Sequence, residues 1–502
     1  MEIFAVCLLL RNPSYPQLLG LLLWMILWEW IIQSCKWLGF MHGGCCLTPY
    51  ILFSISLVII LALISLYVSN MAVAPTINRV HINLAHVRNT NNGDNVDLIK
   101  QQQGSILEQK WFRIVDMLKR IAYLFIFPTE TIAILKIKFG GYIKKMPEMP
   151  LDELAHTLND LDFCYATLNK VSRSFGIVIQ QLPQPLKDSI CIFYLVLRGL
   201  DSIEDDMTYP DDKKIFLLCN FHNNLLIENW SVKNVGDTED YRILLENFGK
   251  VINVFKSLDS ESQSIILNIT SRMGTGMAEY VGKTGSIETV ASYNLYCHYV
   301  AGLVGHGLAA LFSHSGLEDP GLHVHEHLSN SAGLFLQKTN IIRDYLEDLQ
   351  AGRTWWPKEI WCHYAVDLSE FVNNPHGERS LECLNHMVLD ALNHVPDVIN
   401  NLARVKHPKI LESCAIPQVM AIATLAELYN NPLVFTSVVK IRKGLACKLL
   451  LNCSTLNEVY AWFDFFITKI GRKIPKRINV NTHNMHKLVN RVKKLSNINL
   501  KP

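Results

Sequence analysis

The sequence carries the same acidic pattern, D-x-x-E-D, twice, at residues 201–205 and 344–348. On a helix, residues three and four positions apart lie on one face, so each copy gathers three carboxylates. Like charges at this spacing repel one another, and a divalent cation would relieve the repulsion. Oxygen ligands suit Mg²⁺, which can in turn bridge phosphates. The pair therefore predicts a site for Mg²⁺ and a diphosphate.

An apolar stretch leads into each acidic motif, at residues 191–200 and 333–343. Carboxylates that continue apolar helices should lie at the mouth of an apolar cavity, where two facing motifs could hold a diphosphate head. Arg198 and Arg343 precede the motifs, and each could neutralise phosphate oxygens. The alternative is a solvated acidic helix face, which the repetition disfavours. A calcium EF-hand is excluded because no twelve-residue loop with its glycine is present.

The elements that must position these carboxylates are helices. From about residue 151 onward, apolar residues recur at spacings of three and four, as in 151–175 and 332–349. No alternating strand pattern with Asn-Gly turns appears. The sequence predicts one large all-α domain over 125–468. Residues 413–428 are also apolar but contain Pro417, so we expect a buried core helix there rather than a membrane span.

The N-terminal region is hydrophobic. Residues 50–68 form nineteen positions without a charge, which at 1.5 Å per residue would span about 28 Å of bilayer. We predict a transmembrane helix there. Residues 18–32 are a weaker candidate, interrupted by Glu29, for a second span, an interfacial segment or a signal peptide. Residues 1–70 are thus assigned to an anchor region and 71–124 to a polar linker.

The net charge of +2 conceals an uneven distribution. No acidic residue follows Asp464, and this stretch holds ten basic residues, so the first 464 residues carry a balance of −8. We assign 469–502 to a basic tail that either binds an anionic membrane surface or is merely solvated. A hydrophobic content of 49% excludes a disordered chain. The thirteen cysteines form no C-x-x-C or zinc spacing, which indicates reduced thiols in a cytosol-facing domain.

Over roughly residues 125–480 the chain resembles the squalene synthase family of head-to-head prenyl synthases. The matching segments are 168–175, 191–208, 272–280, 296–305, 333–357, 414–431 and 439–444. The resemblance implies an isoprenoid-synthase-type bundle of α-helices around a large central cavity. It also implies an enzyme that uses Mg²⁺ to condense two molecules of farnesyl diphosphate to presqualene diphosphate, which NADPH then reduces to squalene.

The resemblance further implies roles for individual residues. Tyr296 matches the tyrosine proposed to handle the proton in the first half-reaction. The metal positions are Asp201, Glu204, Asp205, Asp344 and Asp348; the substrate positions are Ser172, Arg173, Phe175, Tyr194 and Arg198. The positions for nucleotide or phosphate are Arg173, Arg198, Arg343, Lys440, Arg442 and Lys443. The prediction of NADPH as a cofactor rests on the resemblance alone, because no G-x-G-x-x-G motif opens a helix after a strand.

Family members lie in the endoplasmic reticulum membrane with a catalytic domain facing the cytosol, and we expect the same here, with a monomeric domain and no nucleic-acid partner. Two departures stand out. The family usually carries a C-terminal membrane helix, whereas the predicted spans here are N-terminal. Where the family has a phenylalanine that lines the cavity, this chain has Ser413. The alternatives are therefore a related synthase with an impaired second step, or a non-catalytic membrane protein that binds isoprenoid diphosphates.

Overall fold

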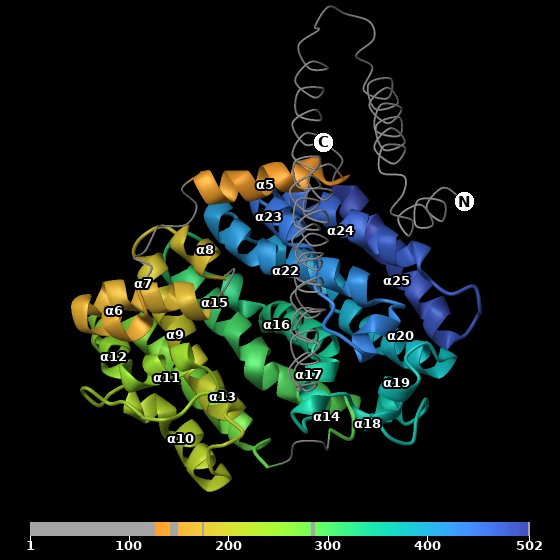
Figure 1. The fold of residues 1–502 in the computed structure, drawn as a ribbon. Helices are drawn as coiled ribbons and strands as arrows, with labels where there is room; N and C mark the ends of the chain where they lie inside the picture. The colour runs from red at the N-terminus through yellow and green to blue at the C-terminus, as the bar shows by residue number, and fades with distance from the viewer. Residues whose placement is uncertain (1–125, 141–148, 173–174, 283–286, 500–502) are drawn as a thin grey trace, which may run out of the picture. The chain divides into compact units, whose positions relative to one another are not determined.

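The computed structural model describes residues 126–140, 149–172, 175–282 and 287–499, which all belong to one compact unit, Lys119–Pro502. Within these residues the secondary structure is helical and contains no strand (Figure 1), which confirms the predicted all-α class. The spans predicted at 18–32 and 50–68, the linker at 71–124 and Arg173 lie outside the described residues.

In the first half of the described chain, most helices pack against the long helix α9 (Leu186–Asp205). The other helices of this half are α5 (Pro128–Phe139), α6 (Leu151–Thr157), α7 (Asp160–Val171), α8 (Phe175–Gln180), α10 (Asp211–Asn224), α11 (Glu239–Glu246), α12 (Phe248–Ser257) and α13 (Ser260–Ala278). Most side chains of α9 are buried, in keeping with its nearly continuous apolar sequence. Gly199 lets α9 pass close to two rings, since a Cβ there would lie 2.8 Å from Phe248 and 3.0 Å from Phe221. Neighbouring helices thus hold α9 in place along its length.

A second central pair is formed by α15 (Leu303–His314) and α16 (Glu326–Arg343). The π-helical turn η2 (His298–Gly302) joins α15 to α14 (Val290–Cys297). The crossing is close because glycines stand where backbones meet. A Cβ on Gly333 would lie 2.3 Å from the carbonyl oxygen of Ala301, and one on Gly305 would lie 2.4 Å from that of Ser329. Only glycine fits at such contacts.

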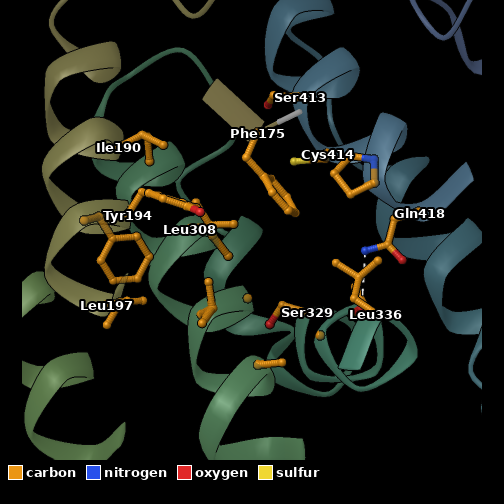
Figure 2. Close-up of a pocket in the computed structure, with 18 of the residues that line it drawn as sticks. Phe175, Ile190, Tyr194, Leu197, Leu308, Ser329, Leu336, Ser413, Cys414 and Gln418 are labelled. Carbon is orange, nitrogen blue, oxygen red and sulfur yellow. Dashed lines mark hydrogen bonds between the residues drawn. The ribbon is translucent and has the colours of Figure 1, made fainter. Parts of the chain in front are cut away.

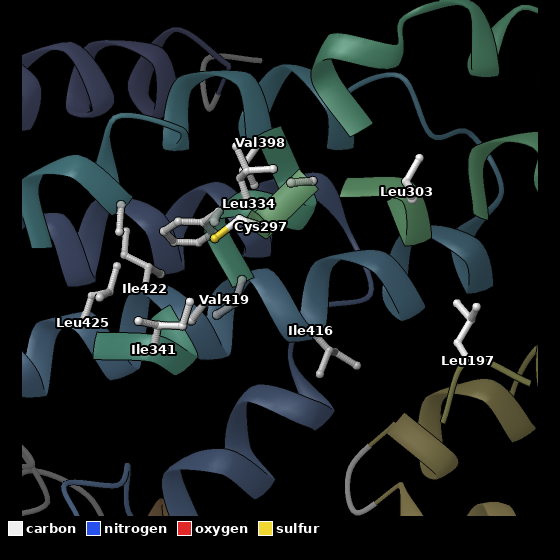
Figure 3. Close-up of a cluster of buried hydrophobic side chains, with 14 of the residues drawn as sticks. Leu197, Cys297, Leu303, Leu334, Ile341, Val398, Ile416, Val419, Ile422 and Leu425 are labelled. Carbon is white, nitrogen blue, oxygen red and sulfur yellow. The ribbon is translucent and has the colours of Figure 1, made fainter. Parts of the chain in front are cut away.

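The remaining elements complete the bundle. They are η3 (Leu322–Val324), α17 (Tyr345–Gln350), α18 (Lys358–Trp361), α19 (Glu370–Asn373), α20 (Glu378–Leu392), α21 (Val395–Leu402), α22 (Pro408–Leu428), η4 (Pro432–Phe435), α23 (Lys443–Leu451), α24 (Leu456–Arg472) and α25 (Val480–Asn499). The predicted core helix is present as α22, whose apolar side chains pack with those of α16 (Figure 3). Among the described helices, Val290–His314 and Pro408–Leu428 are apolar and long enough to span a bilayer. Both are built into the bundle, so length and composition alone do not make them membrane spans.

The basic C-terminal segment is folded rather than free up to residue 499. Its predicted start at 469 falls inside α24, and α25 packs against α24 and α20. Lys469 forms an ion pair with Glu427 at 2.7 Å, and Lys473 donates to the carbonyl oxygen of Ala426 at 2.7 Å. Some of the basic side chains in this segment are therefore bound to acidic or carbonyl groups of the bundle.

Candidate active site

The first acidic motif occupies the C-terminal end of α9, with Asp201, Glu204 and Asp205 in its last turns. The second motif differs from the expectation of one continuous helix. Helix α16 ends at Arg343, and Asp344 stands between α16 and α17. The helical spacing survives the break, because the backbone N–H of Asp348 donates to the carbonyl oxygen of Asp344 at 2.9 Å. Each motif thus keeps its carboxylates within one or two turns of chain.

Arg353 joins the two motifs. Its guanidinium donates to Asp205 at 3.0 Å and to Asp348 at 3.1 Å, so the structure brings both motifs to one place, as the sequence predicted. Gly352, with a φ of +73°, turns the chain after α17, and the backbone N–H of Arg353 then donates to the carbonyl oxygen of Asp348 at 2.8 Å. Sequence reasoning missed Arg353, because its position outside the motif carries no signal.

The two arginines that precede the motifs also bind carboxylates. Arg198 lies 3.4 Å from Asp201, and its guanidinium lies over the ring of Tyr194 at 5.8 Å. Arg343 forms a bidentate pair with Asp344 at 2.7 and 2.6 Å. The buried Nε atoms of Arg198 and Arg353 have no hydrogen-bond partner among the described residues. Unpartnered donors beside carboxylates fit a site that receives an anion together with a cation.

Although arginines pair with Asp201, Asp205, Asp344 and Asp348, burial still disfavours the ionised form of several motif carboxylates. Burial, aided by neighbouring carboxylates, raises the pKa of Asp201 and of Asp348 to about 7 in each case, although nearby arginines act in the opposite direction. Burial and the adjacent aspartates likewise raise the pKa of Glu204 well above its usual range. A bound cation would reverse these shifts by stabilising the ionised carboxylates.

The donor set suits Mg²⁺, but it is not a preformed cage. Among the described residues, no three His, Cys, Asp or Glu side chains are gathered closely enough to hold one ion. Mg²⁺ usually keeps several waters and takes only one or two carboxylates together with substrate phosphates. The carboxylates of the two motifs face each other across the guanidinium of Arg353. This arrangement fits a site in which Mg²⁺ is bound partly by these carboxylates and partly by the diphosphate of the substrate.

Tyr296 lies beside the first motif, in the last turn of α14. Its hydroxyl donates to Glu204 across 3.5 Å, and its ring stacks on Trp355 with centroids 4.2 Å apart and an 8° interplanar angle. Tyr280 meets the same ring edge-on at 5.0 Å. Burial and the nearby carboxylates raise the pKa of the Tyr296 phenol well above its usual range, so it is protonated here. Trp355, like Arg353, was not singled out from the sequence.

A cavity of about 300 Å³ lies within the bundle next to Asp201 of the first motif (Figure 2). Asp201 and Arg198 contribute to its lining from α9, together with the predicted substrate residues Phe175 and Tyr194. The rest of the wall is largely apolar, and most of it comes from α8, α9, α15, α16 and α22. Ser413 also lines the cavity, and its hydroxyl donates to the carbonyl oxygen of Ile410 at 2.8 Å. One carboxylate of the first motif, Asp201, therefore adjoins a largely apolar cavity, in line with the expectation from the sequence.

Other predicted residues lie apart from the cavity. Ser172 is buried, donates to the carbonyl oxygen of Leu168 and is not part of the cavity lining. Lys440, Arg442 and Lys443 do not line the cavity either. Arg442 forms a bidentate pair with Glu130 of α5, at 2.6 and 3.2 Å. The structure thus does not bring this basic cluster into the group formed by the acidic motifs and the cavity.

Comparisons with known proteins find relatives that cover most of this chain. The family model "Squalene/phytoene synthase" matches residues 168–444. A squalene synthase of Homo sapiens is 44% identical over 348 residues, which cover 69% of this chain and 82% of that protein. A squalene synthase of Candida albicans is 47% identical over 356 residues, covering 69% and 78%. A solved complex of TcSQS with the ligand BPH1237 has a TM-score of 0.65 at 41% identity and covers 68% of this chain and 99% of that one.

Proposed function

This chain belongs to the squalene/phytoene synthase family, and we propose that it condenses two molecules of farnesyl diphosphate head to head and converts the product to squalene. The observation that carries the proposal is the meeting of the two acidic motifs, through Arg353, beside a cavity with an apolar wall. A diphosphate head requires the first feature and a farnesyl chain the second. Tyr296 supplies a phenol next to Glu204 of the first motif.

Mg²⁺, held by Asp201, Glu204, Asp205, Asp344 and Asp348, would take up the negative charge of the departing diphosphate. The chain's own residues would do the rest. Arg198 and Arg343 already lie beside carboxylates of the motifs, so they are placed to bind the phosphate oxygens as well. Phe175, Phe193 and Tyr194 line the cavity, where their rings would face the allylic cation and exclude water from it.

The proton of the first half-reaction is proposed to pass through Tyr296. Its high pKa keeps the phenol protonated in the free protein, so little phenolate is available to accept a proton. Neutralisation of Glu204 and Asp205 by a cation would lower that pKa, because the negative charges that oppose phenolate formation would be cancelled. The stacked ring of Trp355 would hold the phenol in place during the transfer.

The second half-reaction is proposed to use NADPH, whose phosphates the resemblance assigns to Arg173, Arg198, Arg343, Lys440, Arg442 and Lys443. Of these, Lys440, Arg442 and Lys443 lie outside the cavity, and Arg442 is paired with Glu130. The position of Ser413 in the cavity wall favours a variant of this function in which presqualene diphosphate is converted to squalene slowly. A hydroxyl there cannot stabilise a carbocation as an aromatic ring does, and it offers water a polar contact. The second candidate function is therefore a synthase that releases presqualene diphosphate.

One product analysis tests both candidates. Purified full-length protein is incubated with farnesyl diphosphate, with and without Mg²⁺ and NADPH, and the products are separated. We expect presqualene diphosphate to accumulate and Ser413→Phe to raise the share of squalene several-fold. Efficient formation of squalene that Ser413→Phe does not improve would refute the proposed role of Ser413.

The metal roles need their own test. Asp201→Asn or Asp344→Asn should abolish diphosphate release, because each removes a charged oxygen ligand. Asp212→Asn, an exposed carboxylate on α10, is the matched control and should retain normal turnover. Normal turnover in either motif variant would contradict the assignment of the metal ligands.

We further propose that the protein lies in the endoplasmic reticulum membrane, as a monomeric catalytic domain that faces the cytosol. All nine cysteines among the described residues are free thiols, which supports a reducing compartment. Trypsin added to sealed microsomes should digest the catalytic domain. Protection of that domain until the vesicles are opened would contradict this orientation.

A further inference from the structure

The inner face of helix α5 is buried against the bundle. Ala133, Ile137 and Glu130 are buried, and α5 packs along α23 (Figure 1). The carboxylate of Glu130 binds the guanidinium of Arg442, which also lies over the ring of Phe127 at 4.1 Å. These contacts fix which side of α5 faces the bundle and which side faces away from it.

The outer face of α5 is apolar and exposed. Ile132 retains 53% of its accessible surface, Leu135 49% and Phe139 75%. Their spacing of three and four places them on one stripe, on the side of the helix opposite to the buried residues. None of the described helices covers this stripe. A row of large apolar side chains on one exposed helix face is typical of an interaction surface rather than of a solvated one.

The charges beside this stripe identify its partner. Lys136 lies within the stripe and Lys138 next to it, and both are exposed. The acidic residue of the helix, Glu130, is on the inner face and paired. An exposed apolar stripe with lysines and no carboxylate matches a bilayer with anionic headgroups, since lysine stems can lie along the apolar boundary while their ammonium groups reach the phosphates.

The sequence before α5 points the same way. The predicted membrane span at 50–68 is separated from Pro128 by about 60 residues, and the sequence predicts a polar linker over most of that distance. A segment of about 60 residues can extend to at most about 200 Å. The length of this segment therefore allows α5 to contact the bilayer that the predicted span would occupy.

We propose that the outer face of α5 is a membrane-docking surface, with Ile132, Leu135 and Phe139 inserted at the headgroup boundary and Lys136 and Lys138 bound to anionic lipid. This inference rests on the proposed membrane location but not on the proposed reaction. Because α5 is tied to α23 through Glu130 and Arg442, docking would fix the orientation of the whole bundle on the bilayer.

Hydroxyl-radical footprinting of the full-length protein tests this surface, with oxidation of single side chains measured by mass spectrometry. The protein is compared in amphipathic polymer and in vesicles of phosphatidylcholine with one-third phosphatidylserine. The matched control is Phe216 on α10, which is 67% exposed. We expect the oxidation of Phe139 to fall about fivefold or more in vesicles while that of Phe216 changes less than about twofold. Equal oxidation of both rings in vesicles would overturn the proposal.

Two further outcomes separate lipid from other partners. If Phe139 is equally protected in polymer, another segment of the chain or a second copy covers the stripe, and the proposal is wrong. The double variant Lys136→Glu/Lys138→Glu should lose most of the protection of Phe139 in anionic vesicles, while product formation in polymer stays at the wild-type level. Retained protection in this variant would refute the role of the two lysines. Because footprinting does not depend on turnover, it stays informative even if the proposed reaction fails.

Discussion

Replacement of Arg353 by glutamine gives the sharpest test of the site geometry. Arg353 is 22% exposed and lies between Asp348, which is 14% exposed, and Asp205, which is 47% exposed. Glutamine keeps much of the side-chain volume and a hydrogen-bond donor but removes the positive charge. In the absence of metal, Arg353→Gln leaves facing carboxylates without the cation that joins them.

The expected loss of stability follows from the two contacts. The bond to the largely buried Asp348 is charge-assisted, and such bonds contribute about 1.5–3 kcal/mol. The contact with Asp205 is half exposed, so water screens it to about 0.5 kcal/mol. Because glutamine retains a weak bond, we expect the free energy of unfolding to fall by about 2 kcal/mol in total. For a domain of this size that corresponds to a Tm lower by about 2–4 °C.

The response to Mg²⁺ distinguishes this role from a simple loss of packing. A cation bound to the carboxylates would replace the missing guanidinium, so Mg²⁺ should raise the Tm of Arg353→Gln more than that of the wild type. The assay is thermal unfolding in EDTA and across a Mg²⁺ titration. Arg477→Gln removes an exposed pair with Glu378 far along the sequence and should not alter the Mg²⁺ response. A variant as stable as the wild type in EDTA, or a deficit unchanged by Mg²⁺, would refute the reasoning.

Two other predictions concern the same region. Trp355→Ala should lower the rate of presqualene diphosphate formation by about three- to tenfold, because a stacked aromatic pair contributes about 0.5–1.5 kcal/mol. Trp355→Phe should restore most of the rate. Equal rates in the wild type and both variants would exclude a positioning role. The raised pKa of Asp201 and Asp348, about 7 each, means that the folded protein binds more protons than the unfolded chain between about pH 4 and 7. In EDTA, stability should therefore decrease as pH rises through this window, and Mg²⁺ should remove the decrease; a Tm that rises with pH in EDTA would contradict the assigned shifts.

Much of the fold could be predicted because its signals are local. The spacing of apolar residues that predicts helices at α9 and α22 involves only residues close together in the sequence. The spacing that puts Asp201 and Asp205 on one helix face is equally local. The prediction that α22 is a core helix was correct for the same reason. The break between α16 and α17 at Asp344 was not foreseen, since the D-x-x-E-D spacing is equally compatible with a continuous helix.

The basic C-terminal region shows where composition misleads. A count of charges predicts a basic tail over 469–502 that binds an anionic membrane surface or is merely solvated. In the structure, Met485, Leu488, Val489 and Val492 of α25 are buried against the bundle. Their spacing of three and four was present in the sequence. A charge count registers the lysines and arginines on the solvent-facing side of that helix but not the apolar residues on its other side.

The sequence by itself determined the helical class, the two carboxylate motifs and the residues that resemble those of squalene synthases. Only the tertiary structure decided that Arg353 bridges Asp205, 148 positions away, that Trp355 stacks on Tyr296 and that Ser413 faces the cavity. The physical reason is that local spacing fixes which face of a helix a side chain occupies, whereas its partner depends on how helices cross. Those crossings are set by close packing at positions such as Gly333, where a single Cβ would force the backbones apart.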